Sequence, residues 1–373
     1  MSKFLFFSLA KHQSKYFKRL LEAPELSGAV RLSVDMPWPR IVDMARVIRR
    51  LNWSQLIEDK CQERQVKAKY AGIFYQLLLR LELLFIALRA QALLDQEQPQ
   101  VLVLWNGSHR YCQILLALLP AGTRTAFFEN GLLPNTTTFD PQGVNFRNSV
   151  PRDAEFYRRY AEHVAQSPEE AIELVPRKPR VEGLQPIELP KQYVFMPFQD
   201  DRDTQVRLFS PWIKNMRELF ALGELIQAKT GLTVVFKEHP SSRESYPELH
   251  QRCHASLLFA NGNSTQELIE SSLFVVTLNS TVGLESLLLG RPLLTLGQAF
   301  FNIPGVVMHA DSAAQMLDIV AAFPEWPVHP ELRNGFLHYL KHQYCVPGSW
   351  QQADDAHVHE VATRMLHLVD KDG

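Results

Sequence analysis

The chain alternates short, fully apolar runs with longer helical patterns, and several of the apolar runs end in a polar turn. Val101–Trp105 is followed by the turn 106–108, and Tyr193–Pro197 and Leu232–Lys237 also lead into polar stretches. A strand that is apolar at every position is buried on both faces, which is typical of a parallel sheet covered by helices. The rhythm therefore predicts an α/β fold.

The remaining patterns extend this order along the chain. Further strands are expected at 5–9, 29–34, 124–128, 257–259, 274–278 and 292–296, and helices at 14–21, 42–98, 110–118, 154–165, 210–230, 245–253, 280–289, 313–322, 330–342 and 354–369. Four prolines and several charges between 176 and 190 indicate a linker. We expect two Rossmann-like domains facing across a cleft, residues 1–185 and 186–350, and a C-terminal helix over 351–373 that could cross back to the first domain.

Composition excludes several classes of protein. The 373 residues include 39 Lys and Arg and 40 Asp and Glu, a net charge of −1 that argues against a dedicated nucleic-acid binder. The four cysteines are widely spaced and form no CxxC pair, so we expect reduced thiols in a cytoplasmic protein. The Leu-rich stretch 73–94 is interrupted by Arg80, Glu82 and Arg89, which favours a core helix, with a peripheral membrane contact as the alternative.

A long polar stretch follows the expected strand 124–128, and it begins with Glu129 and Asn130. Clefts in such folds form at the carboxyl ends of strands, and a carboxylate there can act as a general acid or base. A Gly-Pro loop with ordinary caps is the structural alternative. We expect the first half of the chain to bind the acceptor of a group-transfer reaction.

Three carboxylates lie within four residues after the strand 193–197. Asp200, Asp201 and Asp203 repel one another unless Arg202, a ligand or a metal compensates. The triplet 201–203 matches the short acidic pattern of metal-dependent sugar transferases, but we interpret this match as accidental. A loop that caps a helix is the structural alternative.

Two features of the second half favour a phosphate group. Lys237 and His239 are two residues apart at the end of a strand, so their side chains are expected to point the same way. Ser280 and Thr281 begin a helix, whose free N–H groups attract anions, and Glu285 lies one turn further on, within reach of a ribose. These features predict group transfer from a nucleotide donor, most plausibly a nucleotide-sugar.

The motifs as a set resemble a known family. They are Phe128–Pro134 with Asp140–Asn145, Pro197–Gln199 with Asp203–Gln205, the pair His239-Pro240, Asn279–Thr281, the turn Trp105–Gly107 and the late Pro347–Trp350. In this order, from about residue 100 to 350, they resemble the capsular-polysaccharide biosynthesis family of bacterial β-Kdo transferases, with the related modules of lipopolysaccharide synthesis. The resemblance implies a GT-B fold, CMP-Kdo as the donor and transfer with retention.

The resemblance also implies roles for individual residues. His239 would bind the donor phosphate with Ser280 and Thr281, Glu129 would be the general acid/base, and Asn130 stands where many relatives carry a second acid. Retention by two displacements needs a carboxylate nucleophile, and the family precedent favours Asp203, with Asp200 and Asp201 as open alternatives. Further donor contacts are expected from Lys237, Pro240, Asn279, Glu285 and Gln199, and acceptor or sugar contacts from Asn106, Asn130, Asn145 and Arg202.

We expect no metal ion and no cofactor besides the CMP-Kdo substrate. The expected partners are a saccharide or glycolipid acceptor and no nucleic acid, with the protein in the cytoplasm or at the inner face of the cytoplasmic membrane. A sialyltransferase or another CMP-sugar transferase is the nearest alternative, because sialic acid and Kdo share a carboxylated anomeric carbon. A non-catalytic partner in capsule assembly or export is the alternative from a different class.

Overall fold

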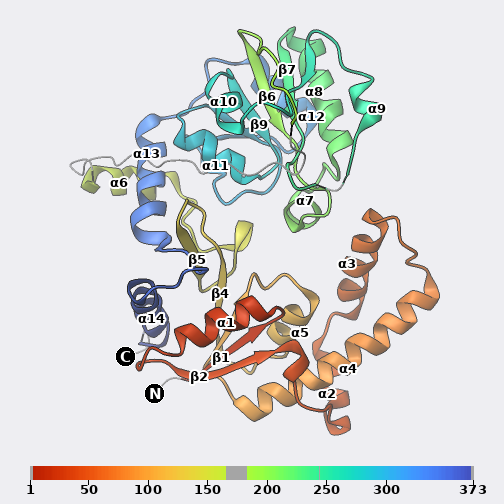
Figure 1. The fold of residues 1–373 in the computed structure, drawn as a ribbon, viewed down its shortest axis with the longest axis vertical. Coiled ribbons are helices and arrows are strands. Elements are labelled where there is room, and N and C mark those ends of the chain that lie inside the picture. The colour runs from red at the N-terminus through yellow and green to blue at the C-terminus, as the bar shows by residue number, and fades with distance from the viewer. Residues whose placement is uncertain (1–2, 165–182, 243, 371–373) are drawn as a thin grey trace. The chain divides into compact units, whose positions relative to one another are not determined.

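The computed structural model describes residues 3–164, 183–242 and 244–370, and the chain folds as two compact units (Figure 1). Of the described residues, unit 1 contains those within 1–131, 135–149 and 344–373, and unit 2 contains those within 132–134 and 150–343. Each unit has its own six-stranded sheet.

The sheet of unit 1 has the strand order β12-β5-β4-β3-β1-β2. Its strands are β1 (Lys3–Ser8), β2 (Ser27–Leu32), β3 (Val101–Trp105), β4 (Arg124–Asn130), β5 (Thr136–Asp140) and β12 (Val346–Pro347). Its helices are α1 (Lys11–Leu20), α2 (Met44–Arg50), α3 (Trp53–Val66), α4 (Ile73–Glu97), α5 (Arg110–Leu118) and α14 (Asp355–Asp370). The four strands β4, β3, β1 and β2 run parallel, while β5 pairs antiparallel with both β4 and β12.

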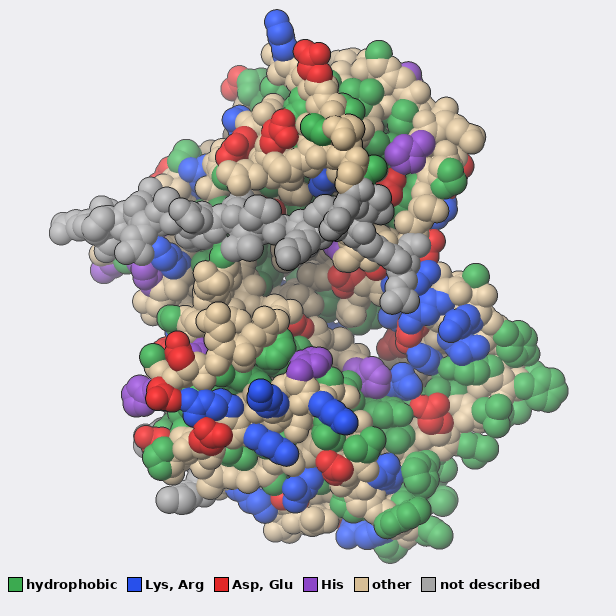
Figure 2. Space-filling view, viewed as in Figure 1, with side chains coloured by type: hydrophobic (Ala, Val, Ile, Leu, Met, Phe, Trp, Pro, Cys, Tyr) green, Lys and Arg blue, Asp and Glu red, His purple; other side chains and the backbone are tan. Residues whose placement is uncertain are grey.

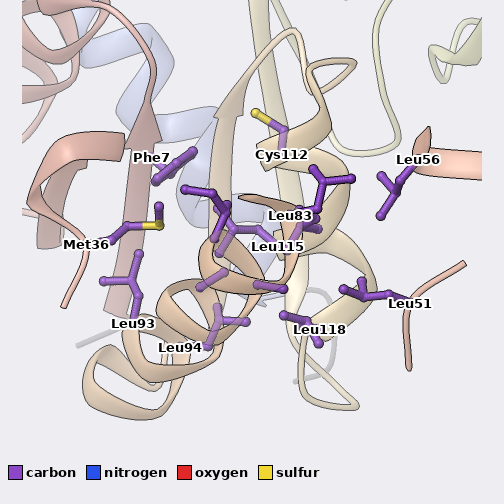
Figure 3. Packing of buried hydrophobic residues seen from close by; sticks show 14 of the residues in the cluster. Phe7, Met36, Leu51, Leu56, Leu83, Leu93, Leu94, Cys112, Leu115 and Leu118 are labelled. Atoms are coloured by element: carbon purple, nitrogen blue, oxygen red, sulfur yellow. The ribbon is translucent and has the colours of Figure 1, made fainter. Parts of the chain in front are cut away.

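Alternate residues of the central strands fill two hydrophobic clusters, one on each face of this sheet. Leu5 and Phe7 of β1 pack in the cluster that includes α4 and α5, part of which Figure 3 shows. Phe4 and Phe6 pack in the other cluster with residues of α1 and α14. Because both faces are covered, β1 is apolar from Phe4 to Phe7.

The sheet of unit 2 is parallel throughout, in the order β11-β10-β9-β6-β7-β8. Its strands are β6 (Tyr193–Pro197), β7 (Thr233–Lys237), β8 (Leu257–Phe259), β9 (Phe274–Thr277), β10 (Leu293–Thr295) and β11 (Met308–His309). Its helices are α6 (Ala154–Val164), α7 (Thr204–Phe209), α8 (Met216–Thr230), α9 (Pro247–His250), α10 (Thr265–Glu270), α11 (Thr281–Leu288), α12 (Ala313–Ala321) and α13 (Pro330–Tyr339).

The units divide at positions that differ from the expected boundaries at 185 and 350. Helix α6 belongs to unit 2 because its aromatic rings pack on α13, with Tyr157 and Phe336 at 5.4 Å between ring centroids. The chain returns to unit 1 from Tyr344, where Val346 pairs with Thr137 and Tyr16 forms a hydrogen bond of 2.9 Å with His357. Much of the expected linker, 176–190, lies outside the described residues.

The interrupted helical pattern expected over 42–98 corresponds to the three helices α2, α3 and α4. Other expected elements were wrong in detail. The expected helix 210–230 begins only at Met216, where Asn215 accepts a hydrogen bond of 3.0 Å from the N–H of Glu218. The expected helix 245–253 is reduced to α9. The polar stretch after Glu129 is not one long loop, because β4 continues to Asn130 and 136–140 forms β5.

Candidate functional site

The carboxylate of Glu129 lies at the end of β4 and is held by the end of the neighbouring strand β3. Asn106 Nδ2 donates a hydrogen bond of 2.6 Å to Glu129 Oε2, and the N–H of Asn106 donates 2.8 Å to the carbonyl of Phe128. Asn106 has a φ of 61° and Gly107 a φ of 79°, so a tight turn follows β3 directly. Glu129 is half-buried, which suits a group that must reach a substrate and keep a fixed position.

Asn130 connects this carboxylate to Trp350. Its N–H and Nδ2 donate to Glu129 Oε1 at 2.9 and 3.0 Å, and its Oδ1 accepts 2.8 Å from Trp350 Nε1. The Trp350 ring stands edge-on to Trp105, with 4.7 Å between centroids. Both the nitrogen and the oxygen of the Asn130 side-chain amide therefore form hydrogen bonds within unit 1. The sequence placed Trp350 only in a motif, and its contact with Asn130 spans 220 residues, which no local pattern reveals.

Asp140 and Asn145, from the same stretch of sequence, have structural positions. Asp140 is fully buried, and its two oxygens accept from the N–H groups of Gln142 and Gly143, from both the N–H and Oγ of Ser149, and from Tyr344 Oη. Asn145 has a φ of 57° and begins a 3₁₀ turn. The carboxylate of Asp140 thus fixes the loop after β5.

Gln199 and Asn279 form a buried pair that joins the ends of β6 and β9. Gln199 Nε2 donates 3.0 Å to Asn279 Oδ1, and the N–H of Asn279 donates 3.3 Å to Gln199 Oε1. Asn279 Nδ2 also reaches the carbonyls of Gln205 and Phe209, at 3.0 Å each. Both side chains were expected to contact the donor, but these hydrogen bonds join their amides to each other and to backbone carbonyls.

The three neighbouring carboxylates have different surroundings. Asp201 is buried, and it accepts from the N–H of Met216 at 2.8 Å and from Tyr246 Oη at 3.4 Å. Burial raises the pKa of Asp201 to about 6. Asp203 is exposed and caps α7 by accepting 2.9 Å from the N–H of Gln205, while Asp200 accepts 2.9 Å from the N–H of Arg202. Asp200 is half-buried, so Asp203 is the most exposed of the three.

Arg202 pairs with Glu244, with Nη2 at 2.5 Å from Oε1. The expected sugar contact would have to compete with this ion pair. Neither Glu244 nor Tyr246 was expected from the sequence, because both belong to the loop after β7 and approach the acidic stretch only in the fold.

Lys237 ends strand β7, so the strand period from which the sequence predicted a shared orientation with His239 does not apply. Lys237 Nζ donates to the backbone carbonyls of Asn261 at 2.8 Å and Asn263 at 2.7 Å, and burial lowers its pKa. The ammonium group thus joins the ends of β7 and β8.

His239 lies half-buried in the turn that continues through Pro240. The N–H of Ser241 donates to His239 Nδ1 at 3.4 Å. An Nδ1 that accepts leaves the ring proton of the neutral imidazole on Nε2, which can then donate.

Ser280, Thr281 and Glu285 lie on α11, which begins at the end of β9. Ser280 caps the helix by accepting 3.2 Å from the N–H of Val282, and Thr281 is exposed in the first turn. Glu285 is half-buried one turn further along the helix. The N-terminus of an eight-residue helix carries partial positive charge.

The sheet order brings the predicted donor residues of unit 2 to one edge. β6 lies between β9 and β7, and neighbouring strands are about 4.8 Å apart. The acidic stretch follows β6, His239 follows β7 and Ser280 follows β9, so the three segments leave adjacent parallel strands at the same end. Within the described residues, no group of three or more His, Cys, Asp or Glu side chains is arranged to hold a metal ion.

The fold is that of a known class. A β-Kdo 2,7-transferase of Thermosulfurimonas dismutans, KpsC, superimposes with a TM-score of 0.52 over 99% of this chain and 100% of that one, at 14% identity. The predicted fold class, α/β of the GT-B type with two Rossmann-like units, is confirmed.

Sequence comparison shows which proteins the chain resembles. Residues 177–319 match the family of capsule polysaccharide biosynthesis proteins. FixF of Sinorhizobium fredii is 35% identical over 273 residues, 73% of this chain and 65% of that protein. The capsule polysaccharide export protein KpsS of Escherichia coli is 25% identical over 253 residues, 50% of this chain and 63% of that protein. The chain thus spans slightly less than two thirds of either relative. The predicted resemblance to the capsule polysaccharide biosynthesis proteins is confirmed over residues 177–319.

Proposed function

We propose that the chain is a retaining β-Kdo transferase, which moves Kdo from CMP-Kdo to a glycan or glycolipid acceptor in capsule or lipopolysaccharide synthesis. The observation that carries this proposal is the shared edge of the unit 2 sheet. It presents a carboxylate, an imidazole and a helix N-terminus from three adjacent strands. Retaining transfer from a CMP-sugar by two displacements uses a protein nucleophile and partners for the departing phosphate, and these three groups can supply them.

Unit 2 is proposed to bind the donor. His239 Nε2 and the first turn of α11, with Ser280 and Thr281, would hold the phosphate, because backbone N–H groups and a helix dipole stabilise an anion. Glu285, one turn along the helix, would accept from the ribose. Lys237 and the Gln199–Asn279 pair would act by fixing the strand ends from which these groups project.

Asp203 is proposed as the nucleophile. Its carboxylate would attack the anomeric carbon of Kdo, the bond from that carbon to the phosphate oxygen would break, and CMP would leave with the bonding electron pair. A second attack at the same carbon, by an acceptor hydroxyl, would release Asp203 and restore the β configuration. Exposure favours Asp203, since Asp201 is buried with both oxygens accepting hydrogen bonds.

Glu129 is proposed as the base that takes the proton of the acceptor hydroxyl in the second displacement. Asn106 and Asn130 hold its oxygens by three hydrogen bonds of 2.6 to 3.0 Å, so the carboxylate is oriented before a substrate binds. Asn145 and Arg202, expected to contact the acceptor or sugar, remain predictions.

We propose that the reaction needs no metal ion. In the acidic triplet 201–203, Asp201 accepts hydrogen bonds from the Met216 N–H and Tyr246 Oη, and Arg202 forms an ion pair with Glu244. The triplet therefore does not present two carboxylates to a common ion, and the developing charge on CMP would be stabilised by α11 and His239.

Release of CMP by the purified chain tests the function. We expect release from CMP-Kdo in the presence of an acceptor glycan, and little from CMP-sialic acid. Preference for CMP-sialic acid would favour the sialyltransferase alternative. No release from either donor by the folded chain, with any of several capsule-derived acceptors, would favour a non-catalytic role in capsule assembly, which the name of the Escherichia coli relative suggests. A glycolipid acceptor would place the reaction at the inner face of the cytoplasmic membrane.

A further inference from the structure

Helix α4 carries an exposed apolar stripe on the side opposite its buried face. Ile73, Leu77, Leu81 and Phe85 are spaced four residues apart, so they line one face of the helix, and Phe74 and Leu78 widen that face. Each of these six side chains is between 43 and 73% exposed. Large side chains of α4 such as Leu83 and Leu93 point into the core instead (Figure 3). Among the described residues, α4 is thus apolar on two sides, of which one is buried in the core of unit 1 and the other is largely exposed.

A second group of exposed apolar side chains lies on the segment that is held by Arg89, one turn along α4 from Phe85. Trp38 is 84% exposed, and Ile41 and Val42 of the 3₁₀ turn η2 (Ile41–Asp43) are exposed to a similar extent. Turn η2 contacts α4, and Arg89 of α4 donates to the backbone carbonyls of Val34, Met36 and Pro37. The segment 34–42 is therefore fixed to the helix.

Hydrophobic side chains gather in Figure 2 where Figure 1 draws α2 and α4. We define the apolar surface as Trp38, Ile41, Val42, Ile73, Phe74, Leu77, Leu78, Leu81 and Phe85. The largest apolar patch of a typical monomer covers about 300–600 Å² and is often functional. The nine large side chains of the apolar surface are each at least 43% exposed, which calls for a partner.

The charge around the apolar surface identifies the partner. Residues 33–89 contain ten Lys and Arg and six Asp and Glu, in a chain whose net charge is −1. Arg80 is exposed next to Leu77 on the helix, and Arg46 and Arg49 are exposed on α2. A second copy of the chain would bring these positive regions together, which is unfavourable. A surface that is apolar at its centre, basic around it and carries an exposed Trp matches an anionic lipid bilayer.

We propose that this apolar surface docks the chain on the anionic face of a phospholipid bilayer, with α4 lying along the interface. None of the helices in the described ranges is long and apolar enough to cross a membrane, and the other side of α4 is committed to the core. Insertion would therefore be limited to the exposed side chains. The proposal concerns unit 1 alone and does not depend on the transferase activity.

Co-sedimentation with vesicles tests the proposal. The full chain is mixed with vesicles of phosphatidylcholine, with or without phosphatidylglycerol. We expect binding to the anionic vesicles, weakened by added salt and at least tenfold weaker on phosphatidylcholine alone. The double variant Phe74→Glu, Leu78→Glu should lose binding by at least tenfold. Leu225→Glu on α8, also an exposed apolar position, is the matched control and should bind like the parent chain.

Two further measurements separate docking from misfolding and from self-association. Circular dichroism and CMP-Kdo binding should be unchanged in the double variant, since both positions are exposed and neither is a proposed donor contact. Brominated lipids should quench tryptophan fluorescence, and Trp38→Phe should remove most of the quenching. Equal binding by the parent and the folded double variant would overturn the proposal, as would a dimer that the double variant dissociates with no vesicle binding by the parent.

Discussion

Asn106 Nδ2 donates a hydrogen bond of 2.6 Å to Glu129 Oε2, which joins the ends of two adjacent parallel strands. The other end of the Asn106 amide accepts from the N–H and Oγ of Ser108, so the side chain cannot turn over without losing those contacts. Asn106 Nδ2 and both the N–H and Nδ2 of Asn130 donate hydrogen bonds to the Glu129 carboxylate. A carboxylate, which only accepts, is the group that fits this position.

Replacing Glu129 by Gln should lower the transfer rate by about 10²–10⁴-fold, the usual effect of losing a general base. CMP-Kdo binding should be nearly unchanged, because the donor is assigned to unit 2. Transfer kinetics and calorimetric titration with CMP-Kdo measure the two effects separately. Glu25→Gln, an exposed change in the same unit, is the control, and full turnover by Glu129→Gln would exclude the assigned role.

Asn106→Ala separates the position of the carboxylate from its chemistry. Glu129 stays, but it loses one of three hydrogen bonds, so we expect a loss of about tenfold in transfer rate, equivalent to about 1.4 kcal/mol. A loss as large as that of Glu129→Gln would mean that Asn106 itself contacts the acceptor.

The Gln199–Asn279 pair should contribute strongly to the stability of unit 2. Asn279→Ala leaves the buried Gln199 amide and the Phe209 carbonyl without this partner, at a cost of about 3 kcal/mol in the free energy of unfolding. Urea denaturation of both single variants and the double variant measures it. We expect the double variant to lose less than the sum of the single losses, because the two residues share one interaction. Strict additivity would contradict direct coupling.

The strands that the sequence predicted best are those buried on both faces. Phe4–Phe7 and Tyr193–Met196 are apolar at each position because helices cover both sides of their sheets. Strand β5 was missed because Thr136–Thr138 reads as polar. Its hydroxyls are satisfied in the fold: Thr137 Oγ1 donates 2.9 Å to the Gly348 carbonyl, and Thr138 Oγ1 donates 3.0 Å to that of Asn130.

The candidate site was predictable only where side chains act locally. Ser280 and Asp203 begin helices, and both caps follow from short-range preference. The contacts of Lys237 depend on carbonyls 24 and 26 residues later, and those of Asp201 on Met216 and Tyr246. These partners approach through the packing of whole strands and helices, which no spacing in the sequence encodes.

Asp201 should make the stability of unit 2 depend on pH. Burial raises its pKa from 3.8 to about 6, so the folded state holds the proton more tightly than the unfolded chain does. This contribution favours folding below about pH 4 and is lost as the pH rises to about 6. Asp201→Asn has no such proton, so its stability relative to the parent should increase from pH 4 to pH 6 and then stay constant. Denaturation midpoints across this range measure it, and a constant difference would contradict the shift.

Asp203→Asn tests the nucleophile with little disturbance of the fold. Asn caps a helix as well as Asp does, so the hydrogen bond from the Gln205 N–H should persist and α7 should be retained. Transfer should be abolished because an amide cannot form the glycosyl-enzyme, while CMP affinity should stay within about twofold, since the proposed phosphate contacts follow other strands. Intact-mass spectrometry of the parent chain with CMP-Kdo alone should show a Kdo-sized adduct that maps to the peptide containing Gln199–Gln205. Asp200→Asn, on the same loop, is the matched control and should keep both the adduct and the activity. An active Asp203→Asn variant, or an adduct on Asp200, would move the nucleophile to the neighbouring carboxylate.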